Sequence, residues 1–260
     1  MIDVKKINYS IDGTQILENI SFKFEKGKFY GILGPNGSGK TTFLDILSGY
    51  KKATESEIYI EDKELKEYSH LEMAKKIAIV PQKFDIVFPF SVEEILEMGR
   101  YPYKRKFSSL QKKDYEIIDS VVKEIGLEKL LKKEITTLSG GEEQRVIFGK
   151  ALIQKTPVLF LDESTSNLDP YYSHTLLSVV KKRVKKEKVT IIGVFHDFNL
   201  ATLYCDEILL FEKGKIVKSG KTEDVLNSKK LEEVFKIGWR KYKTEKHTFV
   251  FPNLRGDKDD

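Results

Sequence analysis

Residues 34–41, GPNGSGKT, place glycines, a lysine and a threonine in the spacing G-x-x-x-x-G-K-[ST]. A strand-like stretch precedes them and a helix-like stretch follows, which is the context of a phosphate-binding loop. The glycines let successive backbone N–H groups turn toward one anion. The sequence therefore predicts a site for the β-phosphate of a nucleotide, built from Asn36, Gly37, Ser38, Gly39 and Lys40.

Three side chains of this loop have separate predicted roles. Lys40 is expected to reach the β- and γ-phosphates, as the lysine of such loops does. Thr41 is expected to ligate Mg²⁺ through its hydroxyl. Thr42 is predicted to touch the α-phosphate. The phosphates of a nucleotide and Mg²⁺ are the ligands that this loop predicts.

A second chemical motif lies at the end of the apolar run VLFLDE, where Asp162 and Glu163 follow four apolar residues. Ligands of α/β folds collect at the carboxyl ends of buried strands. Asp162 suits Mg²⁺ through a water molecule, and Glu163 suits a general base that orients an attacking water. A solvated acidic turn would have the same composition, but the phosphate loop favours the catalytic interpretation.

Three isolated residues are weaker candidates. His196 follows the apolar run TIIGVF and, beside Glu163, would hold the γ-phosphate and the water, although a lone histidine at a strand end is more often structural. Gln82 follows IAIVP, and its amide is able to bind both water and a Mg²⁺ site. Tyr9 lies in a strand-like stretch, where it either packs or stacks on an adenine ring.

Residues 138–145, LSGGEEQR, contain Ser139, Gly140 and Gly141 directly before a helical pattern. Free backbone N–H groups at a helix start form an anion site. An ordinary cap explains the same residues, because Ser139 with Glu142 three positions later matches a capping box. The anion site and the capping box are compatible if the capped helix still has backbone N–H groups that donate to an anion.

An α/β alternation surrounds the motifs. The helical patterns of residues 91–150, at 91–99, 111–126 and 142–154, have almost no strands between them and predict a helical subdomain of about 88–155 inserted between two strands. Another helix is expected at about 171–185, and a shorter one at 199–204. Strands are predicted at 7–11, 20–25, 29–34, 56–62, 75–81, 157–163, 189–197, 207–214 and 215–220. A first helix is expected to run from Lys40 to near Gly49.

The amino-acid composition limits the kinds of partner and the location that this chain is expected to have. The 45 lysines and arginines against 40 aspartates and glutamates give a net charge of +5, which is too evenly mixed to argue for nucleic acid. The single cysteine, Cys205, lies in an apolar run and is expected to be a buried structural thiol. No secretory signal and no run of about 18 apolar residues is visible, so work at a membrane would require a partner.

The ordered set of motifs resembles the ATPase subunit of an ABC transporter over residues 1 to about 225. It comprises the phosphate loop, Gln82, LSGGE, LFLDE, SNLD (166–169) and His196. The resemblance implies an α/β phosphate-loop NTPase core with a mostly parallel sheet, an N-terminal antiparallel β-subdomain and the helical subdomain. It places the ATPase domain at 1–226, with a short extension at 227–260 to which no function is assigned. Tyr9 falls where that family places its adenine-stacking aromatic residue.

The resemblance also implies partners. Two copies would face head to tail, with each ATP between the phosphate loop of one chain and Ser139, Gly140 and Gly141 of the other. Ser166 and Asp169 would cross this interface. Residues 82–103 would contact a polytopic permease, and a substrate-binding protein would act indirectly. The chain is then expected to be a peripheral protein at the cytoplasmic face of the cell membrane.

Two segments, FPFSVEEILEMGRYPY (88–103) and HDFNLA (196–201), are similar to the ATPases of importers for iron–siderophore complexes, haem and cobalamin. The alternatives are another ABC importer, a split exporter or an ABC ATPase switch outside transport. Ser164 stands where the family usually has proline, and Glu57 where it usually has glycine. Both departures concern turn geometry and the subfamily, not phosphate chemistry.

Overall fold

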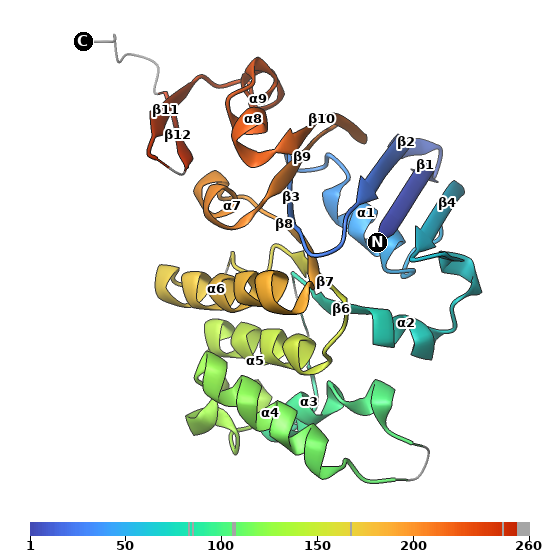
Figure 1. Ribbon diagram of the computed structural model, residues 1–260, viewed down its shortest axis with the longest axis vertical. Helices are drawn as coiled ribbons and strands as arrows, with labels where there is room; N and C mark the ends of the chain where they lie inside the picture. The colour runs from blue at the N-terminus through green and yellow to red at the C-terminus, as the bar shows by residue number, and fades with distance from the viewer. Residues whose placement is uncertain (83, 85, 106–107, 167, 246, 254–260) are drawn as a thin grey trace. The chain divides into compact units, whose positions relative to one another are not determined.

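A computed structural model describes residues 1–82, 84, 86–105, 108–166, 168–245 and 247–253 of the chain (Figure 1). It divides into two compact units, Met1–Glu67 with Ile192–Asp260, and Tyr68–Ile191. Strand β8 (Thr190–Val194) carries the chain from the second unit back to the first. The predicted α/β class is confirmed, with parallel strand pairs and a separate antiparallel sheet near the N-terminus.

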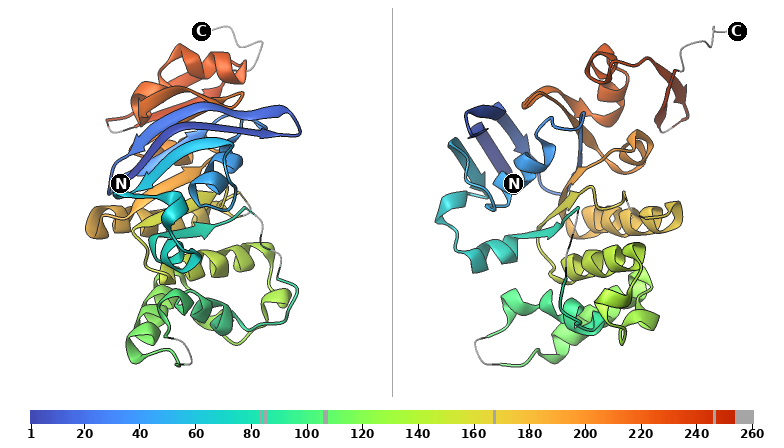
Figure 2. Two further views of the ribbon diagram at one scale, coloured as in Figure 1. Left: turned by 90° about the vertical axis from the view of Figure 1, so that its right-hand side faces the viewer. Right: turned by 180° about the vertical axis from the view of Figure 1, so that it is seen from behind.

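The antiparallel sheet of the first unit has the strand order β2-β1-β4-β5 and is visible as blue arrows in Figure 2. Its first hairpin closes at Asp12 and Gly13, both at positive φ, as the tight turn of an Asp-Gly hairpin requires. The first strand starts at Ile2, five residues before the predicted start, and a register shift follows Val4. The strands are β1 (Ile2–Ile11), β2 (Thr14–Phe24), β4 (Glu55–Ile60) and β5 (Lys63–Glu64), followed by a 3-10 turn at Leu65–Glu67.

The buried sheet of this unit carries the phosphate loop. Strand β3 (Phe29–Leu33) is buried at every position and pairs in parallel with β9 (Glu207–Glu212), which pairs antiparallel with β10 (Lys215–Lys221). Helix α1 (Lys40–Leu47) follows β3 after six residues. The Phe24 ring of β2 contacts the rings of Tyr30 and Phe43, and the Phe43 ring of α1 also contacts Phe211 of β9.

The C-terminal part of the unit contains more regular structure than the sequence predicted. Helix α7 (Phe198–Tyr204) lies near its predicted position. Beyond residue 221 the chain forms α8 (Thr222–Leu226), α9 (Lys229–Phe235) and a hairpin of β11 (Trp239–Lys243) and β12 (Thr248–Pro252). The predicted extension 227–260 is therefore described as a helix and a hairpin up to residue 253, while 246 and 254–260 lie outside the described residues.

The second unit begins with α2 (His70–Lys76) and contains the parallel pair β6 (Ile77–Val80) and β7 (Val158–Asp162). The insert between these strands is helical: α3 (Val92–Met98), α4 (Lys112–Ile125) and α5 (Gly140–Ile153), with 3-10 turns at Tyr101–Tyr103, Glu128–Leu130 and Ile135–Thr137. Helix α6 (Pro170–Glu187) follows β7. Figure 1 shows α4, α5 and α6 in successive layers, and Arg183 of α6 contacts both other helices.

Candidate functional site: a phosphate loop and an acidic strand end

Several positions of the phosphate loop accommodate only glycine. Gly37 and Gly39 have φ values of 74° and 97°, in the left-handed region that L side chains rarely adopt. A Cβ atom at Gly34 would lie 2.4 Å from the backbone oxygen of Phe211, and one at Gly39 would lie 2.6 Å from Leu17 Cδ2. The loop is thus fixed by its contacts with β9 and β2.

Two buried polar side chains lie in this loop. Lys40 is only 5% exposed, and its ammonium donates hydrogen bonds to the carbonyl oxygens of Gly34 (2.9 Å) and Pro35 (3.0 Å). Ser38 is 3% exposed, and its hydroxyl oxygen has no hydrogen-bond partner among the described residues. A buried hydroxyl without a partner costs free energy, so the Ser38 hydroxyl is a candidate hydrogen-bond donor to a bound anion. Asn36, Gly37 and Thr41 are exposed, and Thr42 is half-buried.

The other two candidates of the first unit lie near elements of this loop. Phe195 donates its backbone N–H to Ile32 of β3 at 3.1 Å, so the exposed His196 follows a residue bonded to the strand that leads into the loop. Tyr9 pairs with Leu17 in the first hairpin, beside a register shift, and is half-buried. That position leaves part of its ring accessible.

In the second unit the structure brings Gln82 and Glu163 together. Strands β6 and β7 are parallel with Val80 opposite Leu161, so both residues emerge at the same edge. The Gln82 amide donates a hydrogen bond to a carboxylate oxygen of Glu163. Asp162, the last residue of β7, is 8% exposed. The predicted polar edge at the strand ends is therefore present within this unit.

Glu163 has a strained backbone. Its φ is +47°, although it is not a glycine. Such residues cost of order 1–3 kcal/mol and are retained where surrounding structure holds them. Here the Glu163 carbonyl accepts hydrogen bonds from the backbone N–H (3.1 Å) and hydroxyl (2.8 Å) of Ser166. The turn directs the chain away from β7 immediately after Asp162.

The capping box predicted at the start of α5 is confirmed. The Ser139 backbone N–H and hydroxyl donate to one carboxylate oxygen of Glu142 at 3.0 and 2.9 Å, and the Glu142 N–H donates back to the hydroxyl at 3.4 Å. These hydrogen bonds from the Ser139 backbone and hydroxyl hold the pKa of Glu142 below its usual value. Ser139 and Gly140 are exposed, and a Cβ atom added at Gly140 would meet nothing within 4 Å.

Asp169 has a structural role that the sequence interpretation did not consider. It caps α6 by accepting the Tyr172 N–H at 3.0 Å, directly before Pro170 in the first turn. The pattern Asp-Pro at a helix start would have indicated this cap. Ser166 is exposed, while Asn167 of the SNLD motif lies outside the described residues.

One supporting residue was missed. Gln144, inside α5, is buried and donates its side-chain amide to the carbonyl of Pro81 at 3.4 Å. Pro81 precedes Gln82, so α5 supports the turn that carries the Gln82 amide. A polar residue at a buried position of a helix was the available signal.

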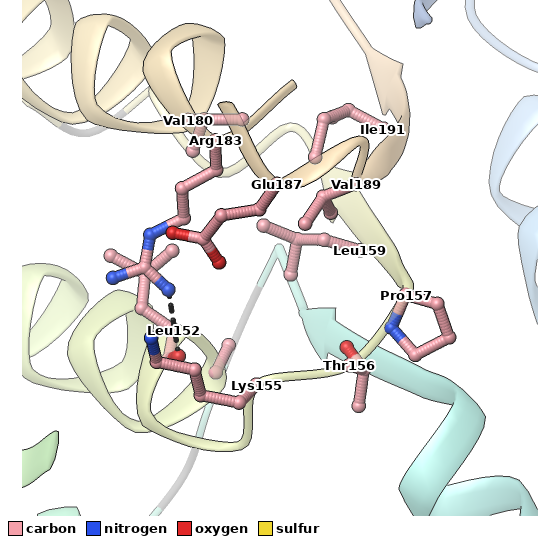
Figure 3. A pocket seen from close by; sticks show the side chains of 11 residues that line it. Leu152, Lys155, Thr156, Pro157, Leu159, Val180, Arg183, Glu187, Val189 and Ile191 are labelled. Atoms are coloured by element: carbon pink, nitrogen blue, oxygen red, sulfur yellow. Dashed lines mark hydrogen bonds between the residues drawn. The ribbon is translucent and has the colours of Figure 1, made fainter. Parts of the chain in front are cut away.

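The second unit also has a pocket of about 260 Å³, lined by apolar residues and by the polar side chains of Lys155, Thr156, Arg183 and Glu187 (Figure 3). It lies at the start of β7, near Thr156 and Leu159, and so at the opposite end of the strand from Asp162. The Arg183 guanidinium donates to the Leu152 carbonyl at 2.9 Å and to Glu124 at 3.1 Å. Arg183 thus hydrogen-bonds to a carbonyl oxygen in the last turn of α5. We therefore interpret the pocket as a gap between packed helices.

Comparisons with known proteins identify the family. A family model described as ABC transporter matches residues 17–166. The chain belongs to the ABC transporter family. The resemblance that the motifs carried is therefore confirmed, and the chain is an ATP-binding cassette of the kind that couples ATP hydrolysis to transport.

Individual relatives agree. This cassette is 36% identical to the hemin import ATP-binding protein HmuV of Escherichia coli O157:H7, over 89% of its own length and 90% of that protein. It is 34% identical to the petrobactin import ATP-binding protein YclP of Bacillus subtilis, over 90% and 92%. The uncharacterized ABC transporter ATP-binding protein YvrA of the same species is 38% identical over 85% of this chain, which spans half the length of that relative.

Solved structures show the same fold. The cassette superimposes with a TM-score of 0.82 on a chain of an ABC transporter described as of metal-chelate type, in an inward-facing conformation, at 26% identity over 98% and 97% of the two chains. It superimposes with a TM-score of 0.76 on the bacterial cassette MJ0796, solved as a dimer, at 27% identity over 85% and 99%. Among the described residues, no helix combines the length and apolar character needed to span a bilayer.

Proposed function

We propose that this cassette hydrolyses ATP at its phosphate loop and acidic strand end to power a membrane importer of metal chelates such as haem, iron–siderophore complexes or cobalamin. The observation that carries the catalytic part is the hydrogen bond from Gln82 to Glu163 beside the buried Asp162. It orients the Glu163 carboxylate, which we propose as the base, and the neighbouring Asp162 is the proposed metal ligand. A merely nucleotide-binding protein would not need this arrangement.

In this proposal each residue has one role. Lys40 neutralises the β- and γ-phosphates, with the backbone N–H groups of 36–40 around the β-phosphate. Glu163 accepts a proton from the attacking water, which Gln82 and His196 orient. Tyr9 stacks on the adenine.

The metal is proposed from the donor set. Thr41 offers a hydroxyl and Asp162 a carboxylate, which are oxygen ligands of the kind Mg²⁺ takes, the latter through water. Among the described residues no group of three or more His, Cys, Asp and Glu side chains forms a metal site. This fits an ion held largely by phosphate oxygens, and Mg²⁺ would supply charge neutralisation on those oxygens.

We further propose that the cassette works as a head-to-tail homodimer in which Ser139, Gly140 and Gly141 complete the ATP site of the second copy. Ser139 and Gly140 are exposed and the space around Gly140 is open, which supports contact with another molecule. The solved MJ0796 dimer is a precedent for such pairing. Ser166 and Asp169 are proposed to cross the same interface.

The proposed permease contact is the segment 82–103, of which residues 83 and 85 lie outside the described part. It exposes large apolar side chains, with Val87 and Phe88 83% and 69% exposed. Adjacent exposed apolar side chains indicate a protein contact. The permease would hold the cassette at the cytoplasmic face of the membrane, and a substrate-binding protein would select the cargo. The similarity to the hemin import protein HmuV and the petrobactin import protein YclP supports haem- and siderophore-type cargo.

The catalytic role is tested with Glu163→Gln. We expect turnover to fall about 10²–10⁴-fold, because a general base is lost, while ATP binding remains. Steady-state phosphate release and nucleotide titration measure the two effects. Glu116→Gln is the matched control, since Glu116 is an exposed glutamate of α4 in the same unit. Near-wild-type turnover of Glu163→Gln would remove Glu163 from the mechanism.

The dimer is tested in the Glu163→Gln background by size-exclusion chromatography with ATP and Mg²⁺. Ser139→Arg is expected to abolish the dimer and to leave ATP binding by the single chain unchanged. Ser69→Arg is the control, because Ser69 forms the same capping box with Glu72 at the start of α2. If Ser139→Arg removes ATP binding from the monomer, the residue belongs to the site of its own chain.

The importer assignment is tested by purifying the cassette with its permease and identifying the ligand of the associated binding protein. A haem, siderophore or cobalamin-type ligand is expected. Phe88→Asp should weaken co-purification, whereas Tyr242→Asp, which alters another exposed aromatic residue, should not. A ligand of another class would overturn the substrate proposal.

A further inference from the structure

The C-terminal hairpin of this cassette packs on helix α7, which begins two residues after His196. The Asn199 side-chain oxygen of α7 accepts the backbone N–H of Val250 in β12 at 3.1 Å. The Thr202 hydroxyl shares its hydrogen between the carbonyl of Phe198 at 2.9 Å and that of Thr248 at 3.2 Å. Thr248 and Val250 are both 2% exposed, so the contact surface is dry. The hydrogen bonds with Thr248 and Val250 join the first six residues of α7 to the same strand.

An aromatic cluster makes a second attachment on the same helix. The Phe198 ring, in the first residue of α7, lies 4.9 Å from Phe235 and 4.7 Å from Trp239, measured between centroids. Phe235 ends α9 and Trp239 begins β11. Phe198 follows His196 by two residues. Ring clusters of this size contribute stability beyond the area they bury.

The turn between His196 and the helix is itself rigid. The Asp197 carboxylate accepts the N–H groups of Asn199 and Leu200 at 2.7 and 3.1 Å. On the other side Phe195 is bonded to Ile32 of β3. The exposed His196 is therefore held by attachments before and after it in the chain.

Helix α7 has only seven residues, and isolated helices of that length do not hold a conformation in water. Its direction must come from tertiary contacts. We propose that the segment 235–253, apart from residue 246, is a positioning element that sets the orientation of His196 through Phe198, Asn199 and Thr202, and that ATP turnover depends on it. The inference rests on the proposed role of His196 in hydrolysis.

The competing explanation is that the hairpin only stabilises the first unit. The two explanations differ in kinetics. A positioning role predicts a loss of kcat with little change in KM for ATP, because a displaced catalytic group impairs the chemical step more than binding. A purely stabilising role predicts a lower melting temperature with normal kcat in the protein that remains folded.

The test uses the full chain with Asn199→Ala, Thr202→Val and Trp239→Leu. Each is expected to lower kcat about 10-fold, with KM changed less than about twofold. The control is Phe251→Ala, which removes a ring from the exposed face of the same hairpin, where it contacts Tyr242. Thermal unfolding of each variant identifies any that fold poorly. Unchanged kcat in well-folded Asn199→Ala and Thr202→Val would overturn the inference.

A double-mutant cycle separates this inference from the function it rests on. In a His196→Ala background the Asn199→Ala effect should disappear, because the group being positioned is gone. An effect that adds fully to that of His196→Ala would overturn the positioning role. If His196→Ala alone leaves kcat unchanged, the role of His196 in hydrolysis fails. If His196→Ala is inactive while the hairpin variants are normal, only the inference fails.

Discussion

The starts of helices α1 and α5 both contain glycines, but they differ in how their backbone N–H groups are capped. The N-cap of α1 is Gly39, which offers no side chain, and the first turn has no acidic residue. The N-cap of α5 is Ser139, whose hydroxyl and N–H are bonded to Glu142. The first helix start has no side-chain cap, whereas the second satisfies part of its N–H groups through its own capping box.

The difference extends to charge and space. Glu142 and Glu143 place negative charge in the first turn of α5, which opposes a phosphate, while Lys40 adds a positive charge at the start of α1. Gly39 is enclosed by Ile16 and Leu17, but Gly140 faces open space. From this comparison we expect α1 to bind the anion by itself, and α5 to contribute only when an anion is already held elsewhere.

The largest expected effect tests the α1 half of this comparison. Lys40→Ala removes the buried ammonium of the loop, and ATP affinity should fall about 10²–10³-fold, since one preorganised charged donor is lost. Fluorescent nucleotide titration of the isolated chain measures it. Ser139→Ala, at the N-cap of α5, should leave monomer affinity within about twofold. Equal losses of ATP affinity in both variants would show that the two helix starts do not differ in anion binding.

A matched glycine pair tests the enclosure. Gly39→Ala forces a Cβ atom to 2.6 Å from Leu17 and requires a left-handed alanine, so unfolding free energy should fall by about 1–3 kcal/mol. Gly140→Ala adds a helix-favouring residue in open space and should raise it by up to about 1 kcal/mol. Urea denaturation compares the two variants. A destabilised Gly140→Ala would show that α5 begins in a more confined place.

The smallest effect is a pH dependence at α5. The pKa of Glu142 is lowered by the Ser139 hydrogen bonds, so its contribution to stability is present above its unfolded pKa and is lost as pH falls through the folded pKa. Glu142→Gln should be less stable than wild type at neutral pH, and the difference should shrink below about pH 4.5. Denaturation at several pH values measures it. A constant difference across this range would mean that the carboxylate charge is irrelevant to the cap.

Local patterns predicted much of this architecture. The strand, loop and helix around residues 29–47 were predicted because glycine spacing and apolar runs are short-range signals. The capping box at Ser139 was predicted for the same reason, although α5 starts two residues earlier than its apolar pattern suggested. Cys205 is buried as expected, and its sulfur would lie 2.8 Å from a Cβ atom at Gly31.

Other features were missed because they depend on distant partners. Helix α2 has no buried residue and therefore no apolar periodicity, although Ser69 and Glu72 marked its cap. The hydrogen bond between Gln82 and Glu163 requires that β6 and β7 be neighbours, which no local pattern encodes. The C-terminal hairpin was not predicted, since its order comes from packing on α7.

The left-handed turn at Glu163 has a consequence for how this sequence would change under selection. Glycine adopts that backbone freely, so Glu163→Gly would relieve strain at the same time as it deletes the carboxylate. Selection for stability alone would therefore favour glycine at this position, and the proposed role of Glu163 in turnover is what would retain glutamate. Inactive descendants of this cassette should accumulate glycine there, ahead of changes in the buried strand β7 that precedes it.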